Sequence, residues 1–215
     1  MKGLLVKDLL LMKDQWKSTL IVLMMGFFMS FSFDTSVTII YMTIIGCMLA
    51  LGTLSYDEFD NGYQFLFTLP VSRRTYVIEK FAVVICWGIC GMAAGILLSL
   101  LTGFLKNGTA ALFPLEECIG VLFSAAFMAS IMIPIRIKYG SENSKIVIYV
   151  MFGIIAAAVL AFSKLKAAMN FANTVGQWLS GVSDAVIALT LIAIMILIIL
   201  VSMFISFRII EKKEY

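Results

Sequence analysis

The sequence contains no histidine among its 215 residues. Histidine is the commonest general base and metal ligand near neutral pH, so its absence removes much of the equipment of catalysis. A GxxxxGK[ST] phosphate-binding loop, an HExxH motif and a Ser–His pair are also missing. The four cysteines, at 47, 86, 90 and 118, have no zinc-binding spacing. We therefore expect no catalytic residue, no metal site and no ATP site of its own in this chain.

Charged residues are scarce as well. Asp, Glu, Lys and Arg make up 13% of the sequence, about half the share found in soluble domains, and hydrophobic residues make up 62%. A soluble globule of this length could not bury so much apolar surface. The composition therefore predicts an integral membrane protein.

Six stretches carry no charge at all, and each is long enough, or nearly so, to cross a hydrocarbon core of about 30 Å as a helix. They cover residues 18–33, 35–56, 81–105, 118–135, 146–163 and 185–207. No repeat or linker divides them. We expect an all-α membrane protein with six transmembrane helices in a single domain over residues 1–215.

Lys and Arg are sorted between the loops. If the N-terminus is inside, 13 of the 16 basic residues lie on the cytoplasmic side, and only Lys106, Lys164 and Lys166 lie outside. Cytoplasmic loops of membrane proteins carry this excess. The sequence therefore predicts that both termini are cytoplasmic.

Residues 1–17 are expected to form an interfacial helix at the cytoplasmic surface. Leu5, Leu9, Met12 and Trp16 follow the spacing of one helical face. Helices of this kind lie in the plane of the membrane. The alternative is that the segment simply extends the first span.

The longest polar interruption, residues 57–80, has an acidic start followed by an apolar and aromatic cluster. Pro70 ends that cluster, and Ser72 is a suitable N-cap for the next helix. A solvated linker needs no such cluster, so we expect a short helix that docks against another surface. The alternative is that the aromatic residues rest at the membrane interface.

Three further segments bear on packing and gating. Gly88, Gly91 and Gly95 would allow close helix approach, either within the monomer or between two copies. Residues 136–145 are expected to form a short polar loop with room for a second, smaller cytoplasmic contact. Residues 164–184 read as an amphipathic external helix before the last span. Its polar side and its tryptophan, the expected gate residues, are Asn170, Asn173, Gln177 and Trp178.

No ionisable residue lies at mid-depth in any expected span. Ion-coupled transport uses such residues, so a proton- or sodium-coupled carrier is disfavoured. Sodium coordination by backbone carbonyls of a broken helix stays open, since the third span is glycine-rich. The energy source is therefore expected to be a partner that docks at the cytoplasmic face.

Several stretches resemble the small permease subunits of bacterial ABC-2 type exporters. They are Met1 to Leu9, Leu54-Ser55-Tyr56-Asp57-Glu58, Thr68-Leu69-Pro70-Val71-Ser72-Arg73-Arg74 and Val77-Ile78-Glu79-Lys80. The resemblance in arrangement covers the whole chain, and the Leu-Pro-Val-Ser-Arg stretch is its most specific part.

The resemblance implies a permease in a bacterial cell membrane that pairs with a second permease copy or paralogue and with two ABC ATP-binding subunits, which hold ATP and magnesium. The chain looks similar to the group exporting amphipathic peptides, such as the phenol-soluble modulin exporter. A non-transporting six-span protein, such as an immunity or assembly factor, is the alternative. The resemblance also implies that the ATPase docks on a coupling helix in the first cytoplasmic loop. The residues implied are Asp57, Glu58, Phe59, Asp60, Tyr63, Phe65, Leu66, Phe67, Leu69, Arg73 and Arg74.

Overall fold

A computed structural model of the chain describes residues 2–58, 62–68, 72–107, 115–163 and 183–212. The described residues that belong to secondary structure are helical, as expected. The helices are α1 (Lys2–Asp14), α2 (Trp16–Ser32), α3 (Thr35–Glu58), α4 (Gly62–Thr68), α5 (Arg73–Asn107), α6 (Leu115–Ser163) and α8 (Asp184–Lys212).

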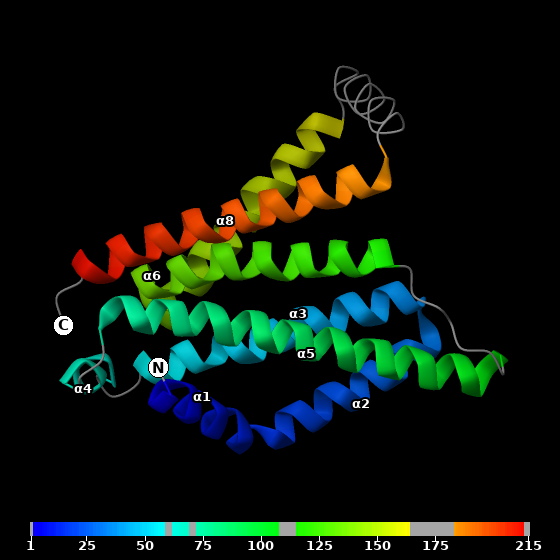
Figure 1. Cartoon of the computed structure of the whole chain (residues 1–215), viewed down its shortest axis with the longest axis horizontal. Helices are drawn as coiled ribbons and strands as arrows, with labels where there is room; N and C mark the ends of the chain where they lie inside the picture. Colours follow the sequence, from blue (N-terminus) through cyan, green and yellow to red (C-terminus); the bar gives the residue numbers. More distant parts are fainter. Residues whose placement is uncertain (1, 59–61, 69–71, 108–114, 164–182, 213–215) are drawn as a thin grey trace.

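The long helices run back and forth between two ends of the molecule (Figure 1). One end, called the α4 end below, holds the start of α1, the short helix α4, the bend in α6 and the end of α8. The opposite end holds the turn between α2 and α3, the end of α5 and the starts of α6 and α8. The described helices therefore alternate in direction, and which end is cytoplasmic stays a prediction.

Several helices are long and apolar enough to cross a membrane. Four candidates in the described chain meet this requirement: α3, α5, the first part of α6 over Cys118–Gly140, and α8. The shorter apolar helix Trp16–Ser32 lies before them. The molecule is thus a multi-pass membrane protein, and the count of six spans stays a prediction.

α6 turns sharply at one residue. Gly140 has φ 78° and ψ 175°, a backbone conformation that L side chains rarely adopt, and helical geometry continues on both sides. The ten-residue polar loop expected over 136–145 is therefore wrong. A glycine replaces the loop because it alone tolerates this φ without a steric cost.

α1 is a separate helix. Gln15, with φ −85° and ψ 14°, separates it from α2, so the alternative in which it extends the first span does not hold. Of its expected apolar face, Met12 is buried in the body, whereas Leu9 and Trp16 are more than half exposed. That α1 rests at the membrane interface stays a prediction. The inward face is Leu4, Asp8 and Met12, one residue in every four.

α3 and α5 form the closest helix pair, and glycines make the approach possible. A Cβ added at Gly46 of α3 would meet the carbonyl oxygen of Trp87 at 2.7 Å. A Cβ at Gly95 of α5 would meet the Cα of Ile39 at 2.8 Å. Gly91 also lies against the backbone of α3. The GxxxG motif of α5 therefore packs against α3 within the monomer.

We expect Gly46→Ala to destabilise the protein by about 1–3 kcal/mol, because the added methyl must push α3 away from the backbone of α5. Thermal unfolding in detergent micelles measures this. Gly52→Ala is the matched control on the same helix, since nothing lies within 4 Å of its added Cβ. It should be neutral or slightly stabilising, as Ala favours a helix. Equal melting temperatures for the two variants would contradict the packing.

Candidate functional site

Charged side chains from three helices meet at the α4 end. Lys80 of α5 lies with its Nζ 2.5 Å from Oδ2 of Asp8 on α1 and 2.8 Å from Oδ2 of Asp57 on α3. Lys7 forms an ion pair with Asp57 and lies 3.4 Å from Asp8. Glu79 is the fifth member, with Oε2 3.9 Å from Lys80. We call these five residues the ion cluster.

Four of the five side chains of the ion cluster are almost fully shielded from solvent, and only that of Lys7 is partly exposed. The side chains of Lys80 and Asp8 have no exposed surface, and that of Asp57 is 4% exposed. Taking charges out of water costs several kcal/mol per ion, so removing one partner of such a pair is much more damaging than the pair is stabilising. These charges therefore persist only while α1, α3 and α5 stay together.

Hydrogen bonds satisfy the cluster further. The hydroxyl of Thr53 donates to Asp8 at 3.2 Å, and Lys80 donates to Thr53 at 3.1 Å. The hydroxyl of Tyr76 donates to Asp57 at 3.0 Å. Burial by itself would raise the pKa of the Asp8 carboxyl, but the charge and hydrogen bond of Lys80 outweigh it and hold this pKa below its usual value. Asp8 is thus an ionised partner in the cluster.

Glu79 differs from the other carboxylates. It is buried, yet neither of its carboxylate oxygens accepts a hydrogen bond from the described residues. The cluster contains two ammonium groups and three carboxyl groups. Asp8 and Asp57 make the short contacts, so their two carboxylates balance the two ammonium groups and Glu79 is the carboxyl group beyond this balance.

The short helix α4 is attached to this cluster through two tyrosines. Tyr63 and Leu66, three residues apart on α4, are each 6% exposed. The ring of Tyr63 packs edge-on against that of Tyr76, with centroids 5.9 Å apart. Tyr76 in turn binds Asp57. A contact path therefore runs from α4 through Tyr63, Tyr76 and Asp57 to α1.

Gly62 sets the start of α4. A Cβ at this position would meet the carbonyl oxygen of Asp57 at 2.5 Å, so a larger residue could not begin the helix so close to the end of α3. The neighbour of Asp57 makes a different contact, because the carboxylate of Glu58 lies against Gly140. Asp57 thus connects the end of α3 to the ion cluster, and Glu58 connects it to the bend of α6.

The residues after α4 hold α8. Ser72 caps α5 as expected, since its Oγ accepts a hydrogen bond from the amide of Thr75 at 3.2 Å. Arg73 donates to the carbonyl oxygens of Ile210 and Glu211 at 3.1 and 3.2 Å, where α8 ends. Arg74 pairs with the carboxylate of Glu211 at 2.8 Å. Both arginines therefore make contacts inside the chain.

The other expected site residues are described to different extents. Tyr63 and Leu66 face the body, as the idea of a docked helix requires. Phe65 and Phe67 belong to α4, but their side chains lie outside the described part. Phe59, Asp60, Leu69, Asn170, Asn173, Gln177 and Trp178 also lie outside it.

Sequence reasoning did not select Lys7, Asp8, Tyr76, Glu79 or Lys80 as site residues. Lys80 and Asp8 are 72 positions apart, and no spacing rule connects them. One local signal was present: Asp8 falls between Leu4 and Met12 at steps of four, which places a carboxylate in the middle of an apolar helical stripe.

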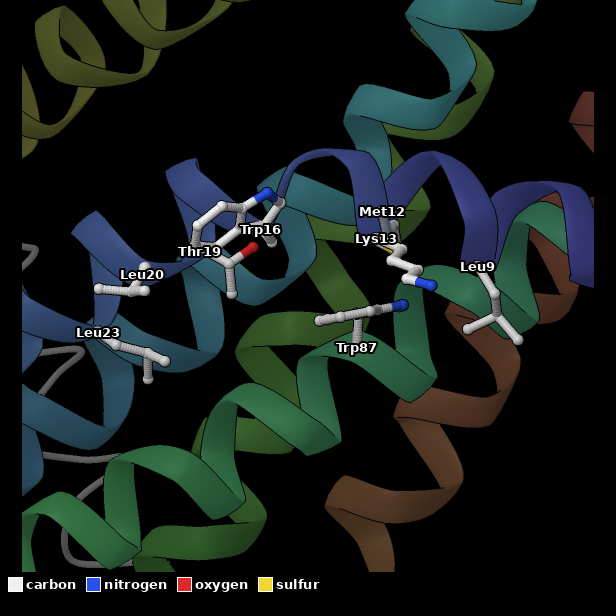
Figure 2. Close-up of a pocket in the computed structure, with 8 residues that line it drawn as sticks. All are labelled: Leu9, Met12, Lys13, Trp16, Thr19, Leu20, Leu23 and Trp87. Atoms are coloured by element: carbon white, nitrogen blue, oxygen red, sulfur yellow. The ribbon is translucent and has the colours of Figure 1, made fainter.

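A pocket of about 440 Å³ opens where α1 and α2 meet, and we call it the elbow pocket. Figure 2 shows the Lys13 side chain of α1 reaching into it, with Trp16 near the elbow and Trp87 coming from α5. Its lining is mainly apolar, and its volume falls in the range of ligand pockets. The lining residues are Leu9, Met12, Lys13, Trp16, Thr19, Leu20, Leu23 and Trp87.

We expect Lys80→Met to cost about 3–5 kcal/mol of stability, because it leaves Asp8 and Asp57 buried without their shared cation. Glu79→Gln is the contrasting variant on the neighbouring residue. It replaces a buried carboxyl group that makes no hydrogen bond in the described part of the chain and should be neutral or stabilising. Thermal unfolding in detergent compares the two, and a Glu79→Gln variant that melts as early as Lys80→Met would refute this assignment of charges.

Comparison with known proteins places the whole arrangement in one group. A family model described as "ABC-2 family transporter protein" matches residues 3–211. The match covers all the helices described above apart from the outermost residues of α1 and α8. The search among curated proteins found no match, and the search among solved structures found none either.

Proposed function

The chain belongs to the ABC-2 transporter family, and we propose that it is the permease subunit of an ATP-driven exporter. Two separate ABC ATP-binding subunits would supply the energy and would hold ATP and magnesium. The observation that carries this proposal is α4, a short helix between two long helices that is bound to the ion cluster through Tyr63 and Tyr76. A partner that moves α4 would move the helices that meet in the cluster.

The proposed orientation places the α4 end in the cytoplasm, with six spans and both termini inside. The described helices support it. Arg73 begins α5 and Lys212 ends α8 at the α4 end, whereas Lys106 lies near the end of α5 on the opposite side (Figure 1). A cell membrane attracts basic residues to its cytoplasmic face, which is anionic. The α4 end is then the face that an ATPase can reach.

The docking surface is proposed to be α4 itself. One face of α4 is used to hold the body, through Tyr63 and Leu66. Thr68, at the end of the helix, is exposed. Asp57 is buried in the cluster, and Arg73 holds α8, so in this proposal both residues position α4 and are not themselves the docking contacts.

The cargo is proposed to be an amphipathic or hydrophobic molecule, with a toxin or antimicrobial peptide as the leading candidate. The bundle exposes large apolar side chains along its helices, and 14 methionines and 17 phenylalanines provide an adaptable apolar surface. The elbow pocket adds a cation to an apolar lining near the cytoplasmic end. A second permease copy or paralogue would complete the path.

The second candidate is a six-span protein that does not transport, such as an immunity or assembly factor. One observation favours the exporter: the ion cluster connects α4 to the body of the protein. An immunity protein would not need this connection. A secondary transporter is less favoured, because these buried charges lie at the α4 end of the bundle and pair with one another. Stimulation of the partner ATPase by an amphipathic peptide in lipid discs separates the three.

We expect Phe65→Glu to abolish co-purification of a co-expressed ABC ATP-binding subunit. Residues one or two positions apart do not face each other on a helix, so a charge at position 65 is expected to spare the contacts of Tyr63 and Leu66. The charge should therefore block docking and leave the fold intact. Phe65→Leu is the matched control, because it keeps an apolar side chain there.

Pull-down through a tag on the permease, with a melting curve of each variant, is the measurement. Loss of the ATPase in Phe65→Glu but not in Phe65→Leu, at unchanged melting temperature, supports docking on α4. Full retention of the ATPase by Phe65→Glu would rule the proposed surface out.

A further inference from the structure

A groove between α6 and α8 at the α4 end gathers positive charge. Lys138, Arg208 and Lys212 line it together with Ile205 and Ile209, and its volume is about 420 Å³. We propose that this groove binds the headgroup of an anionic phospholipid from the cytoplasmic leaflet. The proposal rests on the orientation given under Proposed function, which places this end of the bundle at that leaflet.

The three cations converge from two helices. Arg208 and Lys212 are four residues apart and so lie on one face of α8, and Lys138 comes from α6 two residues before the bend at Gly140. None of the three forms an ion pair with a carboxylate in the described part of the chain. The nearby carboxylate of Glu211 is already taken by Arg74. The groove therefore holds an excess of positive charge that an anion would balance.

Aromatic rings support two of these cations. The guanidinium of Arg208 lies 4.7 Å from the ring centroid of Phe204, and the ammonium of Lys138 lies 5.0 Å from that of Tyr139. Such cation–π contacts hold a charged head against an apolar surface. In the proposed orientation, both charged groups would lie at the level of the lipid headgroups.

The apolar wall of the groove distinguishes a phospholipid from other anions. Ile205 is 46% exposed beside the cations, and Val201 and Leu197 continue the exposed stripe of α8 at steps of four. A phosphate headgroup would meet the cations while its acyl chain follows this stripe. A free phosphate ion, or the acidic surface of a soluble partner, would leave the stripe uncovered. Basic pockets between transmembrane helices on the cytoplasmic side bind anionic headgroups in this way.

Native mass spectrometry of the purified full-length permease, titrated with phosphatidylglycerol or phosphatidylcholine, tests the site. The groove variant combines Lys138→Gln with Arg208→Gln. The control combines Lys17→Gln with Lys145→Gln, which removes the same charge from exposed positions that do not line the groove. Each surface cation contributes about 1 kcal/mol to binding anionic lipid, so the groove variant should bind phosphatidylglycerol about 30-fold more weakly. The control should change little.

Three results would overturn the proposal: equal loss in both variants, equal binding of phosphatidylcholine and phosphatidylglycerol, or displacement of phosphatidylglycerol by inorganic phosphate. Loss of the ATP-binding subunit from the groove variant with unchanged lipid binding would instead assign the groove to an acidic protein. The conservative pair Lys138→Arg with Arg208→Lys should restore binding, which separates charge loss from misfolding. The titration needs no ATPase, so a failure of docking on α4 leaves its outcome intact.

Discussion

The ammonium group of Lys80, held between the carboxylates of Asp8 and Asp57, is the contact on which the rest of the α4 end depends. This contact brings α1, α3 and α5 together. Because the charges are buried, losing one partner would leave the others unpaired at a high cost in free energy. Tyr76 extends the contact to Tyr63 on α4. A short helix that would otherwise be marginal in isolation thereby becomes part of the body.

The end of α3 distributes these contacts. Asp57 faces the ion cluster and Glu58 faces the bend of α6 at Gly140, so two adjacent carboxylates serve two neighbouring parts of the bundle. Arg73 and Arg74, just after α4, hold the end of α8. Every described helix that reaches this end is therefore connected, directly or through one neighbour, to the residues that flank α4. In the proposed function, a force on α4 would reach all of these helices through these contacts.

Sequence reasoning recovered what depends on local pattern. The all-helical membrane class follows from charge-free runs, and the N-cap at Ser72 and the short helix after Gly62 follow from local residue types. It did not recover contacts between residues far apart in the chain, such as Asp8 with Lys80, because no periodicity encodes such a pairing. It also read a polar run around Gly140 as a loop, although one glycine with positive φ suffices to turn the helix. The buried face of α1, with Asp8 between Leu4 and Met12, was not predicted, because the role of a buried carboxylate depends on a partner far away in the chain.

The central claim is that α1 and α4 move as one unit when the partner ATPases act. Pulsed electron paramagnetic resonance between spin labels at Leu10 and Thr68, in a variant without native cysteines and reconstituted with the ATP-binding subunits, measures it directly. Both positions are exposed. Unchanged Leu10–Thr68 distances between the ATP-free and ATP-trapped states, with a changed distance from Thr68 to the same label on the second permease, are the predicted result. A Leu10–Thr68 distance that shifts on ATP binding would contradict the account.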